Sequence, residues 1–416
     1  MTDHTIADAD GSGRGDLTPP SRTRTPVAYD GGDRDLLKIA IVNTLLTILT
    51  LGIYRFWAKT RLRRFLWSHV SFHGERLEYS GLAKELFIGF LVAVAIVLPI
   101  MIVYGVAEFL LAENHPLLSV AAQLIYAFVL AFLISVAIYR ARRYRLSRTQ
   151  WRGIRGGQSG SAFRYAVLNT VYGLVSLITF GLAFPLMRVA LYRYRTANTW
   201  FGDQRFAFEG GTRELIRPWL LVWAFGVLPG IAFLILSPVL MTFDEQTNEL
   251  VAGNMYVFLL LLVIPIGLGL YPLYRAAEIR YFAERTSVAG LGFVSTIRGR
   301  DILFVFVLYA AALAALFVAI GLLLFAVSAA VAQSVEPGAG AGQIGLWQLL
   351  LIALPITLIV FGGVLSTFFL THRMLGVMCR HLTVLGDADF DAIAQSSKDK
   401  PVRGEGFADM LDVDGL

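Results

Sequence analysis

Polar side chains interrupt two apolar stretches of this sequence at similar positions. Six of them are candidates for solute binding or gating: Asn43, Thr47, Thr50, Asn169, Ser176 and Thr179. Side chains of these types can satisfy backbone groups that a broken helix leaves free. Broken helices near the middle of a membrane are also where many transporters bind their solutes. Capping of the backbone at a helix break is the structural alternative for all six residues.

An acidic residue, Glu108, lies inside another apolar stretch. A carboxylate at membrane depth is costly to bury, so such residues usually serve a function. Glu108 is therefore a further candidate for solute binding or gating. Its closeness to Glu113 allows a second explanation, in which lipid headgroups and water reach both acids.

Histidine and cysteine spacing gives little support for metal or thiol chemistry. His69 and His73 are four residues apart, but no third ligand follows nearby. His372 and His381 flank Cys379, the one cysteine of the chain, whose reactivity would require a lowered pKa. The sequence has no Gly-rich phosphate loop, zinc-protease histidine motif or Ser–His elbow. We therefore expect a protein that is not an enzyme and has no cofactor.

The elements that must position these residues are apolar segments suited to a bilayer. The chain has 416 residues, of which 56% are hydrophobic and 16% are charged. Eight segments approach or exceed the length that crosses a hydrocarbon core: Leu36–Trp57, Leu86–Leu111, Leu117–Tyr139, Ala162–Leu182, Trp219–Met241, Val251–Tyr274, Ile302–Ala332 and Gly345–Leu370.

Basic residues predict the orientation of these segments. The connections 112–116, 242–250 and 334–344 contain no Lys or Arg, whereas the other connections are rich in them. The positive-inside rule places the basic connections and both termini in the cytoplasm. Segments 36–57 and 162–182 have basic residues at both ends, so we expect them to be re-entrant or interfacial rather than spanning.

The net charge of +6 favours contact with anionic lipids over binding of nucleic acid. Seven arginines in the basic connections are candidate contacts for anionic lipid: Arg61, Arg63, Arg64, Arg142, Arg143, Arg193 and Arg280.

The chain also repeats itself. Residues 52–86 match residues 181–215, and a shorter third copy aligns Pro185 with Pro272 and Arg193 with Arg280. We predict five parts: a disordered tail (1–33), three membrane repeats of which the third is partial (34–160, 161–290 and 291–390), and a polar acidic tail (391–416).

Five short stretches combine aromatic residues with a central glycine, a pattern typical of β-hairpins: 70–79, 149–153, 199–208, 287–293 and 383–390. These stretches could pair into a cytoplasmic sheet. The predicted fold class is an all-α integral membrane protein. It has six transmembrane helices as three hairpins, two re-entrant or interfacial helices, and short cytoplasmic β-hairpins.

The block from Asn43 to Lys59 resembles the YjgN-like bacterial inner-membrane proteins, a family of unknown function. The second block around Pro185 and the tail Gly404–Asp409 resemble the same family. The resemblance covers nearly the whole chain after residue 33. It implies a bacterial inner membrane, and it brings no substrate, cofactor or catalytic residue.

Two functions follow as hypotheses. The repeats and polar re-entrant segments favour a transporter or channel-like protein. The alternative is a non-catalytic membrane scaffold or envelope-maintenance factor that binds anionic lipid, a partner membrane protein or a second copy of itself. A membrane-embedded enzyme ranks third.

Cysteine labelling in a Cys379→Ser background tests the predicted topology. We expect cysteines placed just before Leu36 and just after Trp57 to react with a membrane-impermeant maleimide from the same side, because the segment between them is predicted not to cross. Labelling of the two positions from opposite sides would show that the segment spans the membrane.

Overall fold

The computed structural model describes residues 23–244, 249–252, 254–334 and 361–396. Its α-helices are α1 (Asp33–Leu49), α2 (Arg55–Ser68), α3 (Ala83–Leu111), α4 (Pro116–Arg148), α5 (Ala162–Ile178), α6 (Phe184–Ala197), α7 (Arg213–Val222), α8 (Leu228–Leu240), α9 (Asn254–Glu284), α10 (Gly299–Ser334) and α12 (Met374–Arg380). Shorter turns are the π-helical η1 (Trp223–Val227) and η2 (Thr367–Arg373) and the 3₁₀ turn η3 (Phe390–Ala392).

Eleven strands form one antiparallel sheet: β1 (Arg24–Pro26), β2 (Ala28–Tyr29), β3 (Val70–Phe72), β4 (Glu75–Tyr79), β5 (Thr149–Trp151), β6 (Ile154–Gln158), β7 (Thr199–Phe201), β8 (Gln204–Phe208), β11 (Thr286–Val288), β12 (Leu291–Ser295) and β13 (Leu382–Leu385). The strands β9 (Met241–Asp244) and β10 (Glu249–Ala252) form a separate two-stranded ribbon.

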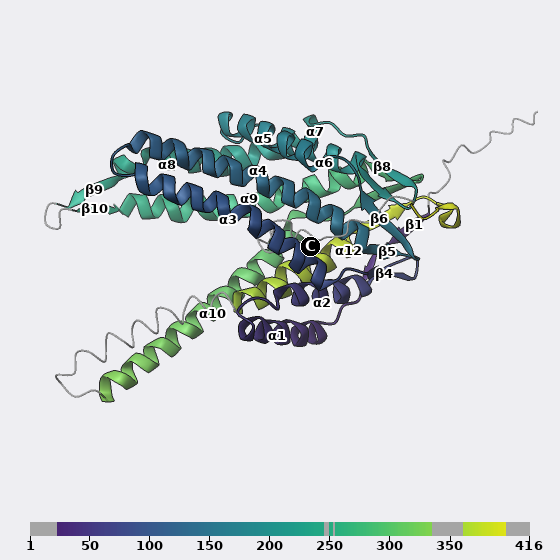
Figure 1. Cartoon of the computed structure of the whole chain (residues 1–416), viewed down its shortest axis with the longest axis horizontal. Coiled ribbons are helices and arrows are strands. Elements are labelled where there is room, and N and C mark those ends of the chain that lie inside the picture. The colour runs from purple at the N-terminus through teal and green to yellow at the C-terminus, as the bar shows by residue number, and fades with distance from the viewer. Residues whose placement is uncertain (1–22, 245–248, 253, 335–360, 397–416) are drawn as a thin grey trace, which may run out of the picture.

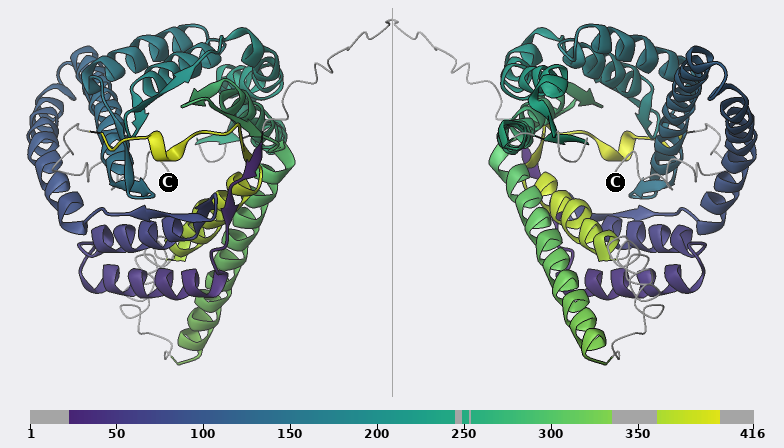
Figure 2. Two further views of the ribbon diagram at one scale, coloured as in Figure 1. Left: turned by 90° about the vertical axis from the view of Figure 1, so that its right-hand side faces the viewer. Right: turned by 90° about the vertical axis from the view of Figure 1, so that its left-hand side faces the viewer.

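The eleven-stranded sheet closes on itself. Its hydrogen-bonded order begins with β1 and ends with β2, and only Val27 separates these two strands in the chain. One extended segment, 24–29, therefore pairs with β13 on one side and with β3 on the other. Figure 2 shows the resulting ring of strands, which we call the strand ring. Closure matters because the free edges of a sheet expose unpaired backbone groups.

The strand ring is built mainly from four hairpins, each following a helix. Three of the turns place two consecutive residues at positive φ, as at His73–Gly74 and Ala289–Gly290, which two-residue hairpin turns require. The first residues of the second strand pair with the first strand of the same hairpin, and its later residues pair with the strand that follows in the ring. In β4, for example, Arg76 pairs with Ser71, whereas Leu77 pairs with Trp151 of β5.

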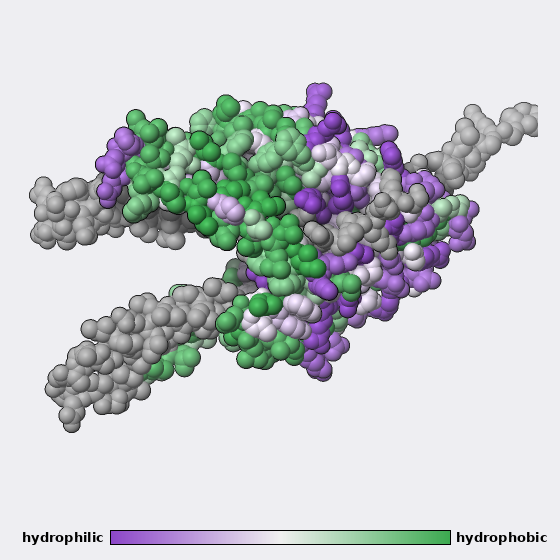
Figure 3. Space-filling model, in the orientation of Figure 1, coloured by the Kyte–Doolittle hydropathy of each residue, from purple (hydrophilic) through white to green (hydrophobic). Residues whose placement is uncertain are grey.

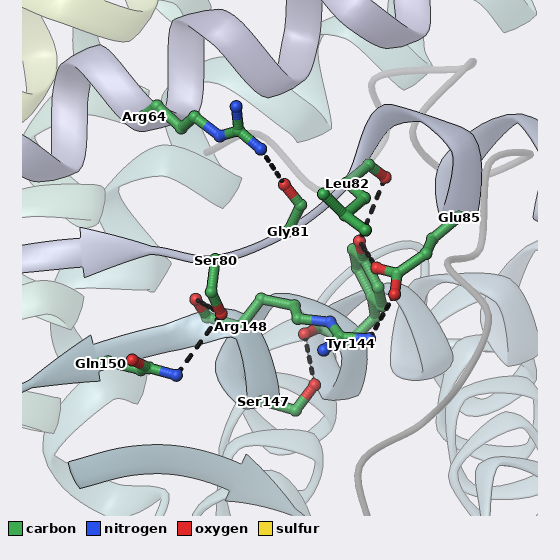
Figure 4. Close-up of polar contacts among 9 residues, drawn as sticks. All are labelled: Arg64, Ser80, Gly81, Leu82, Glu85, Tyr144, Ser147, Arg148 and Gln150. Carbon is green, nitrogen blue, oxygen red and sulfur yellow. Dashed lines mark hydrogen bonds and ion pairs between the residues drawn. The ribbon is translucent and has the colours of Figure 1, made fainter. Parts of the chain in front are cut away.

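An arginine on the preceding helix fastens each hairpin. Its guanidinium donates to a backbone carbonyl seventeen residues later, just beyond the second strand. The distances are 2.8 Å from Arg64 to Gly81, 2.7 Å from Arg193 to Gly210 and 2.5 Å from Arg280 to Ile297, and Arg143 makes the same contact with Gly160. Figure 4 shows the Arg64 contact. Hydrogen bonds from a charged donor are the stronger ones in proteins, so these contacts fix the exit of each hairpin.

The long helices form hairpins that are joined at the strand ring by acid–base pairs. Glu85, in the first turn of α3, accepts from Arg148 at 2.5 Å and from the Tyr144 hydroxyl at 2.6 Å (Figure 4). Equivalent pairs join Glu214 to Arg285 at 2.9 Å and Asp301 to His381 at 3.5 Å. In each pair the acid lies in the first turn of the outgoing helix, and the base lies at the end of the returning one.

Four described helices are long and apolar enough to cross a membrane: Ala83–Leu111, Pro116–Arg148, Arg213–Ala232 and Gly299–Val327. The long helices project from one side of the strand ring, with α10 diverging from the others (Figure 1). Apolar residues cover α3 and α4 on the face shown in Figure 3, whereas the end with the strands is hydrophilic.

The predicted all-α fold with six transmembrane helices is wrong. The structure contains an eleven-stranded sheet, and four described helices qualify as candidate spans. Most of the predicted segment 345–370 lies outside the described residues. All five aromatic stretches contribute strands, and these strands join into one continuous sheet. Residues 24–29, within the segment predicted to be a disordered tail, supply the two strands that close the ring.

The two segments predicted to be re-entrant or interfacial, 36–57 and 162–182, contribute the first helix and the turn of two short helical hairpins, α1–α2 and α5–α6. Each turns at a residue pair with positive φ, Leu51–Gly52 in the first and Phe180–Gly181 in the second. The placement of both hairpins relative to a bilayer stays a prediction.

Two Gly→Ala substitutions should have opposite effects on stability. Gly52 has a φ of +91° and no neighbour within 4 Å of an added Cβ, so Gly52→Ala should cost about 1–2 kcal/mol through backbone strain alone. Gly173 lies inside α5 with equally open space, so Gly173→Ala should gain up to about 1 kcal/mol. Thermal unfolding in one detergent measures both. Equal shifts of the same sign would contradict the turn at Gly52.

Candidate functional site

A cavity of about 640 Å³ lies inside the strand ring, where the ends of α4, α6 and α9 approach the strands. Five arginines line it: Arg142 and Arg145 from α4, Arg188 and Arg195 from α6, and Arg275 from α9. No aspartate or glutamate is among the lining residues that the structure describes. We call it the arginine cavity.

The periodicity of the three helices places these arginines on the faces that point into the ring. Residues three, four or seven positions apart lie on one face of a helix. The lining residues of α6 and the start of β7 follow this spacing, at Arg188, Tyr192, Arg195, Thr196 and Thr199. The two arginines of α4 are likewise three residues apart. The ends of these helices therefore carry arginines on the face that points into the strand ring.

The threonine that begins the following strand fixes each helix end. The side-chain hydroxyls of Thr149, Thr199 and Thr286 each donate to the carbonyl four residues earlier, at 2.9, 2.8 and 2.6 Å. This contact satisfies a carbonyl that the helix end would otherwise leave free. It also sets the direction in which the chain enters the strand ring, and all three threonines line the cavity.

A buried carboxylate holds two of the arginines on one wall of the arginine cavity. Glu278 of α9 is completely buried, and it accepts from the Nε of Arg188 at 2.5 Å and from the Nη1 of Arg275. Burial lowers the pKa of the Arg188 guanidinium, whereas the neighbouring Glu278 carboxylate raises it. The net result is a pKa above the usual value for arginine. Arg188 therefore stays charged, and Glu278 holds two guanidinium groups beside each other.

The described lining of the arginine cavity is rich in positive charge. Glu278 offsets one of the three guanidinium charges of Arg188, Arg195 and Arg275. Within the described residues, the Nε of Arg195 is buried and has no hydrogen-bond partner. Two like charges 6 Å apart repel by roughly 3 kcal/mol at an effective dielectric constant of 20. An anion that enters the cavity would relieve this repulsion, so the arrangement is suited to anion binding.

Aromatic rings form the rest of the lining. Phe206 of β8 stacks against Phe293 of β12 with ring centroids 6.4 Å apart, and Tyr192 stacks against Phe282 at 3.9 Å. Trp151 and Trp200 also line the cavity. The site therefore combines cationic groups with flat apolar surfaces.

The segment 386–396 crosses the strand ring on the side away from the long helices (Figure 2). Its Phe390 contacts the ring of Trp151 edge-on at 4.9 Å. The backbone N–H of Arg155 donates to Oε1 of Gln395 at 3.0 Å, and the space above Gly202 is occupied by Ile393 and Ala394. This segment covers the mouth of the ring, and Trp151 connects it to the cavity.

The predicted solute or gating residues lie in the helical hairpins and outside the lining of the arginine cavity. Asn43 donates to the carbonyl of Ala58 at 3.2 Å, and Asn169 donates to the hydroxyl of Ser135 at 2.8 Å. The two asparagines therefore contact different helices, α2 and α4, and a solute or gating role for them stays a prediction.

The hydroxyl residues of these hairpins mostly shape the backbone. Thr50 and Thr179 accept from backbone N–H groups four residues later, at 2.9 and 3.1 Å, and so begin α2 and α6. Thr47 donates to the carbonyl of Asn43 at 2.7 Å, and the carbonyl of Ser176 accepts from Gly181.

Glu108 lies between α3 and α4. One oxygen accepts from the Ser119 hydroxyl at 2.8 Å and from the Gln123 amide at 3.0 Å. These contacts join two candidate spans, and a solute or gating role stays a prediction.

The seven predicted lipid-contacting arginines occupy four environments. Arg142 lines the cavity, and Arg63 is only 3% exposed. Arg61 is exposed on α2. The other four, Arg64, Arg143, Arg193 and Arg280, are those that fasten the hairpins. Their contact with lipid stays a prediction.

Arg145, Arg188, Arg195, Arg275 and Glu278 were not predicted as site residues. The spacing of seven between Arg188 and Arg195, and of three between Arg275 and Glu278, was the available signal in the sequence.

The histidines mainly hold chain segments together. His69 contacts the carbonyl of Phe65, and His73 packs against Phe390. His372 contacts the Tyr29 hydroxyl at 2.6 Å and Asp33 at 2.8 Å, which joins the two ends of the described chain. Within the described residues, no group of three or more His, Cys, Asp or Glu side chains is placed to hold a metal ion.

Comparison with protein families matches residues 24–410 to the family described as "Bacterial protein of unknown function (DUF898)". Relatives named "Inner membrane protein YjgN" occur in Escherichia coli O157:H7, with 25% identity over 53% of this chain and 61% of the relative, and in Salmonella typhimurium, with 27% identity over 46% and 54%. The chain thus spans little more than half the length of these curated relatives. No solved structure matches. The resemblance to YjgN-like proteins is confirmed.

Cys379 should be an unreactive thiol. It is buried, and burial raises its pKa to about 11. Below that pH the thiol stays protonated, so alkylation by N-ethylmaleimide at pH 8 should be about a hundredfold slower than for a thiol of pKa near 9. The rate should rise as the pH approaches about 11.

The variant Asp203→Cys/Cys379→Ser, which places a thiol in an exposed turn, is the matched control. Rapid alkylation of Cys379 near pH 7, unchanged at higher pH, would instead indicate a stabilised thiolate.

Proposed function

The chain belongs to the DUF898 family of bacterial proteins, and we propose that it is a multi-pass inner-membrane protein that transports small anions by way of the arginine cavity. It acts as a transporter or channel-like protein rather than as an enzyme.

The membrane placement is supported by the four apolar helices and by the names of the relatives. The segments 24–29 and 382–396 both lie at the strand ring, so the two ends of the described chain are on the same side of the long helices. Basic residues gather at this end, and the positive-inside rule then favours the cytoplasm for it.

The observation that carries the proposal is the set of five arginines that line the arginine cavity. Anion pores and anion sites are commonly lined by Arg and Lys. Here the guanidinium groups come from α4, α6 and α9, and α4 is itself one of the candidate spans. Helix α4 thus connects the cationic site directly to the part of the protein that is proposed to lie in the membrane.

Transport is preferred over catalysis because the cavity has few groups that could exchange protons. Arginine does not titrate near neutral pH. The Glu278 carboxylate, which contacts two of the lining arginines, is held by their guanidinium groups.

A second candidate is a non-catalytic scaffold that binds anionic lipid. It is favoured by the exposed Arg61 on α2, next to the apolar α1–α2 turn where Leu51 and Ile53 are exposed. Such a protein would bind anionic vesicles without moving solute.

Anion flux in proteoliposomes tests the proposal. We expect protein in neutral-lipid liposomes to release chloride, inorganic phosphate or glutamate faster than empty liposomes. Arg142→Gln/Arg195→Gln should lower that flux at least about tenfold, because it removes two of the five cavity charges. Arg205→Gln is the control, since Arg205 is exposed on β8 and lies outside the cavity lining.

Wild-type flux equal to that of empty liposomes for the whole panel would overturn the transport proposal. Tight binding to anionic vesicles combined with no flux would favour the scaffold.

A further inference from the structure

We infer that residues 386–396, which we call the strap, form a gate across the strand ring. An anion passes between the arginine cavity and the side of the ring away from the long helices when the strap leaves the ring. This inference rests on the proposed function, because it concerns access to the same cavity.

The closed sheet leaves the middle of the ring as the route on this side. The eleven strands are hydrogen-bonded all round, and the backbone N–H of Val27, between β1 and β2, donates to the carbonyl of Leu382 at 3.1 Å. Paired strands lie only about 4.8 Å apart, so a solute has no passage between them. The strap crosses the opening that remains (Figure 2).

The strap runs from one side of the ring to the other. It starts after β13, where Asp387 accepts from the Thr23 hydroxyl at 2.7 Å. It ends at β6, where Arg155 donates to Gln395 at 3.0 Å through its backbone N–H and to the Ser396 carbonyl at 3.1 Å through its guanidinium. In the strand order, β12, β11, β8 and β7 separate β13 from β6 in one direction, and β1 to β5 separate them in the other. The strap thus follows a diameter of the ring rather than its wall.

Phe390 anchors the middle of the strap. Its ring centroid lies 4.9 Å from that of Trp151, 5.2 Å from that of His73 and 6.0 Å from that of Phe72. Trp151 also lines the arginine cavity. One side chain therefore contacts both the strap and the proposed anion site.

The turn between β7 and β8 is shaped to receive the strap. Gly202 has a φ of +57°, and a Cβ added there would lie 2.5 Å from the carbonyl oxygen of Ala394 and 2.6 Å from the side chain of Ile393. A side chain at this position would force the strap away. The preceding residue, Phe201, lines the arginine cavity, so the strap lies directly over the cavity wall.

The strap is held less firmly than the strands that it crosses. Between Leu385 and the end of the described chain the structure has the turn η3 and no strand, so release of the strap breaks no strand pairing. The ion pair of Arg152 with Asp391 is 3.9 Å long, and the Asp391 side chain is 99% exposed, so solvent screens it. Segments with few buried contacts open before the elements they cover.

A purely structural brace is the alternative. A brace would stabilise the ring without controlling access to the cavity, so measured access distinguishes the two roles.

The rate of thiol labelling inside the cavity measures access. Ala283→Cys, in the Cys379→Ser background, places a thiol in the cavity lining. The reagent is the anion 2-sulfonatoethyl methanethiosulfonate, and the protein is held in neutral-lipid nanodiscs. Gly202→Ala should raise the labelling rate at least about tenfold, because the added methyl group displaces the strap. Phe390→Ala should do the same by removing the anchor.

Gly153→Ala is the matched control. Gly153 lies in the neighbouring hairpin turn at a φ of +72°, and no atom lies within 4 Å of an added Cβ. This variant therefore carries the backbone strain of Gly202→Ala without contacting the strap, and its labelling rate should equal that of the parent protein. Unfolding temperatures in the same nanodiscs confirm that each variant is folded.

Equal labelling rates in all four proteins would overturn the gate. An equal rise in Gly153→Ala and Gly202→Ala would also overturn it, because strain in the ring would then explain the access. In proteoliposomes, Phe390→Ala should raise anion flux at least about threefold over that of the parent.

The two readouts separate this inference from the proposed function. Anion flux in the parent protein with unchanged labelling in the strap variants would defeat the gate and leave the proposed function standing. Faster labelling in the strap variants without flux in any protein would defeat the proposed function and leave the strap as the element that controls access to the cavity.

Discussion

Each long helical hairpin is joined at the strand ring by an acid–base pair, on which the positions of the other elements depend. Glu85, Glu214 and Asp301 lie in the first turns of outgoing helices, and Arg148, Arg285 and His381 lie at the ends of returning ones. Acids favour the positive end of a helix dipole and bases favour the negative end. In each pair the acid and the base therefore interact favourably with the ends of their own helices and also with each other. The contact also holds the two helices side by side where their chains leave for the strands.

This alignment explains why a cationic site forms there. The helix ends are the most basic part of the chain, and the strand ring draws three of them together around a single space. Isolated two-stranded hairpins are marginally stable in water. Interlocked pairing, with each second strand shared between two hairpins, lets short strands hold these charged helix ends in place against their mutual repulsion.

Local signals in the sequence were sufficient for some features and insufficient for others. The aromatic stretches around Gly74 and Gly290 predicted hairpin turns, because positive φ at glycine is a local requirement. The strand order and the closure of the sheet were not predicted, because its pairings join distant segments, such as Leu77 with Trp151. Counting basic residues predicted a charged side but not the direction of each side chain. Arg142 was therefore assigned to lipid although it faces the cavity, and Arg188, Arg195 and Glu278 were overlooked.

The pairing of β1 with β13 has a consequence for biosynthesis. The segment 24–29 is among the first parts of the described chain to leave the ribosome, yet its partner β13 is translated more than three hundred residues later. Until then the growing sheet retains two open edges, which are prone to wrong pairing. The last hairpin must reach the ring before the first segment finds its partner. Completion of the ring thus reports that the entire intervening chain has been made and inserted, and an interrupted chain would be left with exposed strand edges for chaperones or proteases to recognise.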